Sequence, residues 1–427
     1  MLCLLIIVPT IILIITSILY FPTLKLGPFK FGSYWVIALI SAIVLILFRF
    51  ISFSTIWDSF TANTAVNPLK ILVLFISMTI LSIILDEVGF FQYIAIKSTK
   101  LFKNSQIKLF FGFYILISFL TIFTSNDIII LTFTPFICYY TKNTKINPIP
   151  YLVSEFIAAN TWSMILIIGN PTNIYLASAF NIDFLSYFIS MAIPTLVAGI
   201  ISLTLLFLIF RKYLNEPIQS FEATAITPKK FLVIVGLIHL IITTILLAIS
   251  SYINLEMWYI TLTFSISLLI WATIYNSIKK YNTAYLKRTI LRAPWSLIPF
   301  VLSMFIIVLS LNEQGITKII GDFLNKLEPV FAYGITGAFS ANLINNIPMS
   351  VLFSNLLTNT TIDAVYASIA ASNIAAFITP IGALAGIMWM SLLKSYNIKF
   401  SFKEFMKYGC IIGIPTLLSV LLIIFII

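Results

Sequence analysis

The sequence predicts an all-α polytopic membrane protein with about ten transmembrane helices plus two re-entrant helical hairpins, arranged as an inverted (5+5) repeat. Three observations predict this class. Of the 427 residues, 60% are hydrophobic and only 9% are charged, whereas a soluble domain has roughly a quarter of charged residues. Long apolar runs recur along the chain, with Lys and Arg in the short loops between them. Polar residues interrupt some of these runs at matching places in the two halves of the chain.

A membrane-spanning helix needs about 20 mostly apolar residues, and the chain has ten segments of this kind. They are residues 2–20, 34–51, 69–86, 151–180, 188–210, 231–250, 256–276, 295–312, 364–392 and 406–426. Two further apolar stretches, 107–141 and 331–357, carry polar residues near their centres. Each of these two could be a long span or a re-entrant hairpin that returns to its own side.

The charges of the loops favour hairpins. If both stretches are hairpins and the N-terminus lies outside, most of the 25 Lys and Arg residues fall in cytoplasmic loops, Lys103 and Lys142 among them. The outside then keeps Arg49, Lys70, Lys318 and Lys326. Cytoplasmic loops of membrane proteins are enriched in basic residues. We therefore expect a bacterial plasma-membrane protein whose basic loops lie on the cytoplasmic side and whose two termini lie on the outer side.

The same topology contains an internal symmetry. We predict a single membrane domain, 1–427, built from a first repeat at 1–212 and an inverted second repeat at 231–427. Asn126-Asp127 in the first hairpin corresponds to Asn345-Asn346 in the second. Matched helix breaks of this kind point to the binding site of a secondary transporter, because unwound backbone is tolerated in the membrane only where protein or a wet cavity covers it.

The first repeat offers two candidate sites. At the first hairpin tip, Ser125, Asn126 and Asp127 could bind a coupling proton or Na⁺, since a charge inside the membrane is usually functional; they could equally cap the second hairpin helix. In the span that follows, the run Gly169-Asn170-Pro171-Thr172-Asn173 breaks the helix, because Pro171 removes a backbone donor. Its amide and hydroxyl groups could bind a solute or only close a loop.

The second repeat offers the counterparts. The second tip is Asn345-Asn346-Ile347-Pro348, with Asn342 one turn earlier, and the second break contains Thr379 and Pro380. Capping and a plain proline kink are the alternatives at these two places. Asn160 and Asn373 precede the two breaks on the same spans, where each could reach the site or bond a neighbouring helix.

Other features restrict the chemistry. The three cysteines, Cys3, Cys138 and Cys410, are far apart and form no metal or disulfide motif. Glu155 is expected at the membrane interface, one turn into its span. The sequence has no nucleotide-binding motif and no catalytic set, so we expect no enzyme. The basic residues lie in short loops between apolar runs, so we do not expect a nucleic-acid binder either. We expect no cofactor and no metal site, although H⁺ or Na⁺ could be the coupling ion, the latter near Asn126, Asp127 and Asn170.

Four stretches carry a family resemblance. They are Leu85-Asp86-Glu87-Val88-Gly89-Phe90-Phe91, Ala293-Pro294-Trp295, Asn345-Asn346-Ile347-Pro348 and Ile378-Thr379-Pro380-Ile381-Gly382-Ala383-Leu384-Ala385 continuing to Trp389. With these the chain resembles the ion transporter superfamily over nearly its whole length, and within it the arsenite/antimonite efflux permeases of the ArsB type. The resemblance implies antiport of arsenite or antimonite for protons, a scaffold with a moving core, a homodimer and, in some members, a separate ATPase subunit.

The chain departs from the arsenite pattern at Asn160 and Asn373, near which that pattern has acidic residues. Its first break, 169–173, is more similar to Na⁺/H⁺ antiporters of the NhaD type and to divalent anion/sodium symporters. The alternatives to proton-coupled arsenite efflux are therefore a Na⁺-coupled anion symporter of the dicarboxylate type or a Na⁺/H⁺ antiporter. An uncharged polar site suits neutral arsenous acid, whereas helix N-termini at the breaks would suit an anion.

Overall fold

The structure is a computed structural model, and it describes residues 2–21, 23–26, 29–63, 67–101, 105–216, 218, 228–250, 252–280 and 283–427. Lys103, which we predicted in a cytoplasmic loop, lies outside the described residues. Helices make up most of the described chain, so the all-α polytopic class is confirmed. A small antiparallel hairpin of β1 (Thr23–Leu26) and β2 (Phe29–Gly32) was not predicted.

The helices of the first half of the chain follow the predicted segments. They are α1 (Leu4–Tyr20), α2 (Ser33–Leu47), α3 (Phe53–Thr61), α4 (Pro68–Glu87), α5 (Phe90–Leu101), α6 (Gln106–Phe123), α7 (Asn126–Thr144), α8 (Ile149–Trp162), α9 (Pro171–Ala179) and α10 (Phe184–Phe210). The predicted span 151–180 is two helices, α8 and α9, separated by a 3₁₀ turn at Ile167–Gly169. The stretch 107–141 is likewise two helices, α6 and α7.

The helices of the second half also follow the predicted segments. Its helices are α11 (Lys230–Ala248), α12 (Met257–Lys279), α13 (Ala284–Arg292), α14 (Leu297–Glu313), α15 (Ile316–Leu324), α16 (Pro329–Ile344), α17 (Asn346–Leu356), α18 (Ile362–Ile374), α19 (Leu384–Ser395) and α20 (Phe402–Ile426). The predicted span 364–392 is interrupted between α18 and α19. The short helices α3, α5, α13 and α15 were not predicted, because they are too short for the span criterion.

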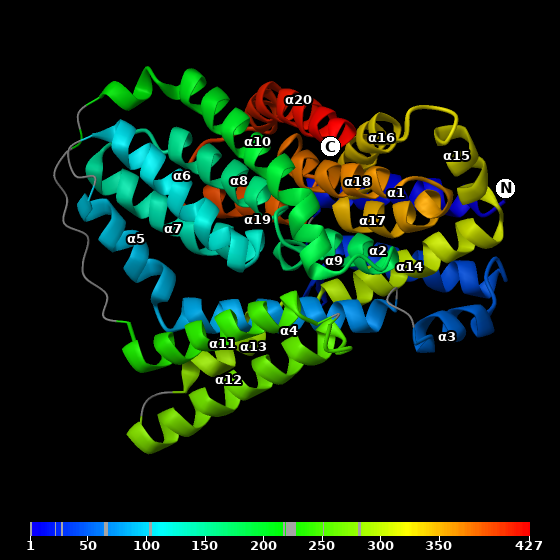
Figure 1. The fold of residues 1–427 in the computed structure, drawn as a ribbon, viewed down its shortest axis with the longest axis horizontal. Helices are drawn as coiled ribbons and strands as arrows, with labels where there is room; N and C mark the ends of the chain where they lie inside the picture. The colour runs from blue at the N-terminus through cyan, green and yellow to red at the C-terminus, as the bar shows by residue number, and fades with distance from the viewer. Residues whose placement is uncertain are drawn as a thin grey trace.

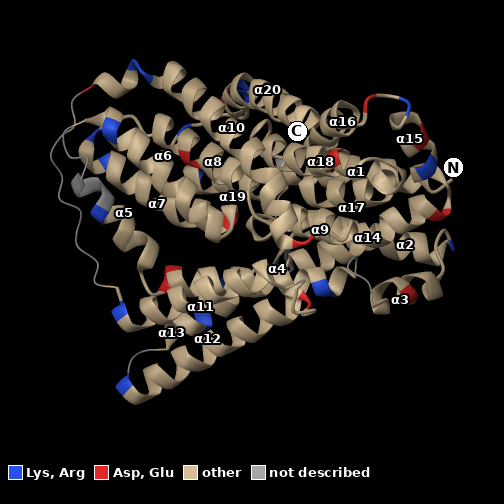
Figure 2. Cartoon of the chain, viewed as in Figure 1, with Lys and Arg blue, Asp and Glu red and all other residues tan. Residues whose placement is uncertain are grey.

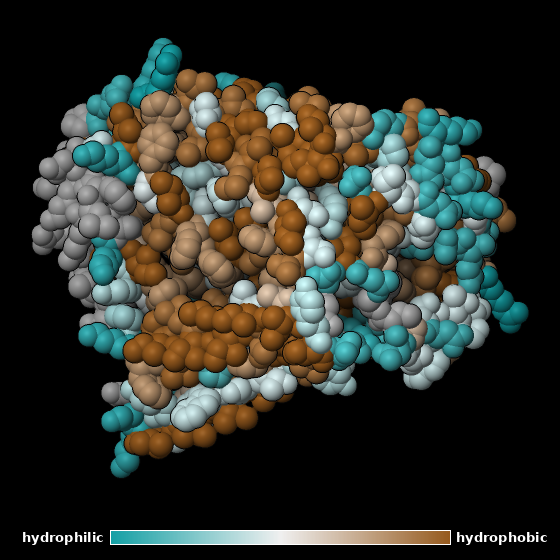
Figure 3. All heavy atoms as spheres, viewed as in Figure 1, coloured by the Kyte–Doolittle hydropathy of each residue, from teal (hydrophilic) through white to brown (hydrophobic). Residues whose placement is uncertain are grey.

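Among the described residues, seven helices are long and apolar enough to cross a membrane by length and composition. They are Pro68–Glu87, Gln106–Phe123, Phe184–Phe210, Lys230–Ala248, Met257–Lys279, Phe402–Ile426 and, with α13 and α14 taken together, Ala284–Glu313. Figure 1 shows most of these helices running roughly along the long axis of the molecule. Lys and Arg gather at the two ends of this axis, and many lie at the left-hand end (Figure 2). Hydrophobic side chains cover much of the middle (Figure 3), as expected for a belt that faces lipid.

Two groups of helices can be distinguished by their packing. The scaffold, α1, α2, α4 and α11–α14, is tied together by the pairs α2–α14 and α4–α12. The core comprises α6–α10 and α16–α20. In Figure 1, α11 and α12 lie along one side of α4, while α6, α7, α8 and α10 lie on the other.

Within the core, corresponding helices pack in corresponding ways. The helix α6 packs against α8 and α16 packs against α18, while α7 packs against α19 and α17 packs against α9. The helices α10 and α20 pack against each other. The pairs α7–α19 and α17–α9 each join a helix of one half to a helix of the other half, as an inverted repeat predicts. The repeat boundaries and the re-entrant character of 107–141 and 331–357 stay predictions, since α6 alone is long enough to cross a membrane.

A group of ion pairs closes one end of the scaffold. Arg292 bonds the carboxylates of Asp86 and Glu87, each at 2.7 Å, and Arg288 bonds Glu87 at 2.7 Å. These bonds fasten α13 to the end of α4. The Arg292 side chain is 32% exposed and the Glu87 side chain 7% exposed, so the pair is shielded from water on one side.

Arg292→Ala is therefore expected to destabilise the scaffold by about 3 kcal/mol, because the largely buried Asp86 loses its described ion-pair partner and Glu87 keeps only Arg288. Arg288→Ala is the matched control: its side chain is 58% exposed, and exposed ion pairs contribute only ~0.5 kcal/mol. Thermal unfolding of the two variants in detergent measures the difference. Equal losses of stability would contradict a special role for Arg292.

Candidate functional site

The first helix break packs around the side chain of Asn373, at the end of α18. The Asn373 Oδ1 accepts hydrogen bonds from Ser163 Oγ and Asn170 Nδ2, each at 3.0 Å. Its Nδ2 donates to Asn173 Oδ1 at 2.7 Å and to the carbonyl of Ile369 at 2.8 Å. One carboxamide thus connects a helix of the second half of the chain to the break in the first half.

Local sequence explains the shape of this break. Asn170 caps α9 by accepting from the Thr172 backbone N–H at 3.3 Å, and Pro171 occupies the first helical position, which needs no N–H donor. Asn173 Nδ2 donates to the carbonyls of Ser163 and Leu166 at 2.8 and 3.1 Å, and the Leu166 carbonyl also accepts from the Gly169 N–H. The unwound backbone is thereby satisfied by side chains, as the apolar surroundings require.

Glycine is required at position 169 because a Cβ there would lie 2.1 Å from the carbonyl oxygen of Ser163. A further bond joins Thr172 Oγ1 and Ser372 Oγ at 2.9 Å. We define the Asn373 network as the side chains joined in this way. They are Asn126, Asn160, Ser163, Asn170, Thr172, Asn173, Ser372 and Asn373, all of which are at most 2% exposed.

The first hairpin tip joins this network through Asn160. Asn126 Nδ2 donates to Asn160 Oδ1 at 3.0 Å, and Asn160 Nδ2 donates to the carbonyl of Phe156 at 2.8 Å. Ser163 Oγ also bonds the backbone carbonyl of Asn160 at 2.9 Å. Ser125 is a helix cap, the alternative that the sequence analysis left open: its side chain accepts from the Ile128 N–H at the start of α7.

Asp127 differs from its neighbours. It lies in the first turn of α7 and is partly exposed. Among the described residues, none forms a hydrogen bond or an ion pair with its carboxylate. It lies within electrostatic range of Tyr34 in α2, so it is near the scaffold. Its oxygens are therefore free to bind an ion or a solute.

The second hairpin tip is bonded to the second break. Asn345 has a φ of 75°, an uncommon conformation that costs of order 1–3 kcal/mol and tends to occur at functional sites. Its Nδ2 donates to the Ile381 carbonyl at 2.9 Å, and the Asn346 N–H donates to the Gly382 carbonyl at 3.0 Å. Thr379 Oγ1 donates to Asn342 Oδ1 at 2.6 Å.

Four helices begin at these tips and breaks. The helices α7 and α17 begin at the two hairpin tips, and α9 and α19 begin after the two breaks. The helix α17 packs against α9, and α19 packs against α7. Helix N-termini carry partial positive charge and favour anions or the oxygen atoms of polar solutes.

A large cavity of about 910 Å³ reaches the second break. Pro380 and Ile381 of the break line it, together with one face of α19, the end of α1 and the segment between α19 and α20. Among the described residues that line it, Lys394 and Lys399 are charged and none is acidic. The cavity thus borders the second break and is large enough to hold water or a small solute.

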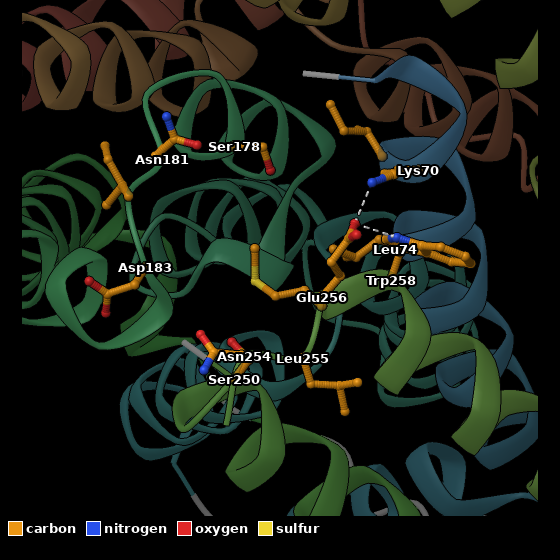
Figure 4. Close-up of a pocket in the computed structure, with 13 residues that line it drawn as sticks. Lys70, Leu74, Ser178, Asn181, Asp183, Ser250, Asn254, Leu255, Glu256 and Trp258 are labelled. Carbon is orange, nitrogen blue, oxygen red and sulfur yellow. Dashed lines mark hydrogen bonds and ion pairs between the residues drawn. The ribbon is translucent and has the colours of Figure 1, made fainter. Parts of the chain in front are cut away.

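A second pocket, of about 330 Å³, lies between the start of α4 and the α9–α10 and α11–α12 connections. Figure 4 shows Lys70 and Glu256 on one side of it and Asp183 on the other. Lys70 Nζ bonds Glu256 at 2.6 Å, and Trp258 Nε1 donates to the same carboxylate at 2.7 Å. None of the predicted site residues lines this pocket, and its lysine is already paired.

Glu155, which we expected at the membrane interface, is enclosed by protein. Its side chain is 0% exposed in the second turn of α8. The Thr134 hydroxyl is 2.9 and 3.0 Å from its two carboxyl oxygens, and Trp389 Nε1 is 3.4 Å from one of them. The apolar sequence around Glu155 does not show which helix face it occupies, and so gave no sign of this burial.

Sequence reasoning also missed two members of the Asn373 network. Ser163 follows Asn160 by one helical turn, and Ser372 directly precedes Asn373. For Ser163 the available signal was its place one turn after Asn160, because residues three apart share a helix face. Ser372 had no such signal beyond its position next to Asn373. The binding roles of the Asn373 network, of Asp127 and of the second tip and break stay predictions.

Comparison with known proteins identifies the family. The sequence profile of citrate transporters (CitMHS) matches residues 11–367. The chain belongs to the CitMHS citrate transporter family. This family member is accordingly a multi-pass membrane transport protein of the secondary type, and not an enzyme.

Curated relatives of the CitMHS protein carry a more specific name. An arsenical pump membrane protein of Escherichia coli is 26% identical over 404 residues, which are 90% of this chain and 89% of the relative. One of Yersinia enterocolitica is 26% identical over 368 residues, 80% of this chain and 83% of the relative. The predicted resemblance to the ion transporter superfamily and its arsenite branch is confirmed.

A solved structure shares the fold. The YdaH transporter of Alcanivorax borkumensis, whose crystal structure is described as having an unusual topology, superposes with a TM-score of 0.60. The match covers 99% of this chain and 97% of that one, at 12% identity. At this identity the likeness concerns the fold alone.

Proposed function

We propose that this protein exports arsenite or antimonite in exchange for protons. The observation that carries the proposal is the Asn373 network, a buried set of amide and hydroxyl groups without a charge. Arsenous acid is neutral near pH 7 and presents hydroxyl groups, which can both donate to and accept from such side chains. The names of the Escherichia coli and Yersinia enterocolitica relatives support the same substrate.

Asp127 is proposed to carry the coupling ion. It borders the network through Asn126, and its carboxylate has no partner among the described residues. A carboxylate in this position can bind a proton, or Na⁺ together with the amide oxygens of Asn126 and Asn170. No cofactor is needed for either mode.

Two observations favour a second candidate, a Na⁺-coupled anion symporter of the dicarboxylate type. Four core helices begin at the tips and breaks, and the described lining of the large cavity contains Lys394 and Lys399 without an acidic residue. Both features attract anions. The description of the family as citrate transporters agrees with this candidate. A Na⁺/H⁺ antiporter remains the third alternative within the superfamily.

The proposed orientation follows from the basic residues. The end of the molecule with many Lys and Arg (left in Figure 2) is placed on the cytoplasmic side of the bacterial plasma membrane. Both termini are then outside, and the cavity with Lys394 and Lys399 opens to the cytoplasm. A homodimer and a separate ATPase subunit are further proposals, which rest on the family resemblance.

Everted membrane vesicles test the proposal, because their outer face is the cytoplasmic one. In vesicles with an acidic interior, arsenite should dissipate the proton gradient only when the protein is present, and the host cells should gain arsenite resistance. In parallel experiments, citrate and Na⁺ are added to the same vesicles in place of arsenite. A gradient that arsenite leaves unchanged, in a host that stays sensitive, would overturn arsenite efflux; a response to citrate with Na⁺ would favour the symporter.

A further inference from the structure

Glu155 is a carboxyl group enclosed in the core, away from the Asn373 network. It projects from α8 between α7 and α19, which contribute Thr134 and Trp389. All three side chains are at most 1% exposed. The fixed geometry around Glu155 indicates a specific site and not a chance placement.

The described surroundings of Glu155 contain no cation. Thr134, Trp389 and the thiol of Cys138, which lies within electrostatic range on α7, are the polar or titratable groups of the described residues that act on it. The nearby lysine of α19, Lys394, lines the cavity on the other face of that helix. An isolated carboxylate in such a place would cost several kcal/mol of desolvation. The neutral acid is therefore the form that this enclosure stabilises.

The hydrogen-bond distances also fit a protonated carboxyl. The Thr134 hydroxyl is close to both carboxyl oxygens, at 2.9 and 3.0 Å, but a hydroxyl has a single hydrogen to donate. With a protonated carboxyl, the hydroxyl donates to one oxygen and accepts from the other. Both short distances are then satisfied, while Trp389 Nε1 covers the site from α19.

The helix α19 separates this carboxyl from the large cavity. Its inward face, with Ala385, Trp389 and Leu393, is buried against the core. Its opposite face, with Ile387, Met390 and Lys394, lines the cavity of about 910 Å³. Only the width of one helix, about 10 Å, therefore lies between Glu155 and space that is large enough to hold water.

The helix α19 is a short helix that is attached to the rest of the core by few polar bonds among the described residues. It has only 12 residues, it follows the second break, and no described side chain caps its N-terminus. Ala385 and Gly386 give its first turn a smooth inner surface, and a Cβ on Gly386 would lie 2.6 Å from the Pro380 carbonyl. The hydrogen bond from Trp389 to Glu155 is long, at 3.4 Å, so it is weak and breaks early when α19 moves.

We propose that Glu155 is a second proton-binding site, which α19 opens and closes. When Trp389 covers the carboxyl, it holds a proton; when α19 moves away, water from the cavity reaches it and takes the proton. α19 can pack back only after Glu155 has been protonated again, which links proton transfer to movement of the half-helix that follows the second break. This inference deepens the proposed proton coupling and rests on it.

Infrared spectroscopy of the purified, reconstituted protein tests the proton directly. The carbonyl stretch of a protonated carboxyl should be present at neutral pH, be lost in Glu155→Gln, and persist in Glu313→Gln, whose glutamate is exposed at the end of α14. Trp389→Phe keeps an aromatic ring but removes the indole N–H donor. The carbonyl band of this variant should therefore disappear at an alkaline pH at which the wild-type band remains. A band that survives in Glu155→Gln, or one that is absent from the wild type, would overturn the proposal.

Transport supplies a separate readout. Glu155→Gln should keep solute counterflow without a pH gradient and lose the acceleration that a pH gradient gives the wild type. If the wild type shows no counterflow of arsenite or citrate, the proposed function fails, while the infrared band still reports on Glu155. If Glu155→Gln responds to the gradient as the wild type does, the proposed function stands and the inference about Glu155 is wrong.

Discussion

Asn373→Ala is expected to abolish solute transport and to lower the free energy of unfolding by roughly 3 kcal/mol or more. The substitution removes the acceptor of Ser163 and Asn170 and the donor to Asn173. Each buried polar group that is left unpaired costs about 1–3 kcal/mol, and the first break is no longer bonded to α18 through this side chain. Counterflow in proteoliposomes and thermal unfolding measure the two effects.

The matched control for Asn373 is Asn276→Ala. Asn276 is also buried in a transmembrane helix, where its Nδ2 bonds the Ala272 carbonyl and the Tyr285 hydroxyl. It belongs to the scaffold, so the variant should lose stability and keep transport. Normal transport by Asn373→Ala would show that the network only holds the fold.

Asp127→Asn is expected to reduce ion-coupled transport at least about tenfold, a loss of ~1.4 kcal/mol or more, without preventing membrane insertion. Asparagine can still cap or hydrogen-bond at the start of α7, but it can neither carry a proton nor bring a negative charge to Na⁺. Solute uptake driven by a pH or Na⁺ gradient measures the loss, and membrane abundance measures insertion.

Asp363→Asn is the corresponding control, because Asp363 also lies in the first turn of a core helix, α18, but is exposed. It should transport like the wild type. Coupling that survives in Asp127→Asn would reduce Asp127 to a structural residue of the hairpin tip.

The helix breaks could be located from the sequence because their signals are local. Pro171 and Gly169 stop a helix through their own backbone properties, and asparagines inside an apolar run indicate that the freed backbone groups are satisfied there. The same reasoning places Asn345 and Thr379. What a local signal cannot give is the partner, so the bonds that join Asn373 to the first break had to come from the structure.

Burial could not be predicted in the same way. The helices α4 and α11 are both strongly apolar, yet α4 is mostly enclosed while α11 exposes Ile234, Ile238 and Ile241 to lipid. In a membrane protein an apolar side chain suits both environments, so periodicity does not separate them. For this reason Glu155 was placed at the interface, although packing encloses it between α7, α8 and α19.

Equilibrium binding tests most directly the claim that the Asn373 network is the substrate site. Purified protein without Cys3, Cys138 and Cys410, which removes thiols that could bind arsenite, is dialysed against arsenite and, separately, against citrate with Na⁺. The account predicts that one of these ligands binds saturably to the otherwise unchanged protein and to its Asn276→Ala variant, and not to its Asn373→Ala variant. Equal binding by all three proteins would contradict it.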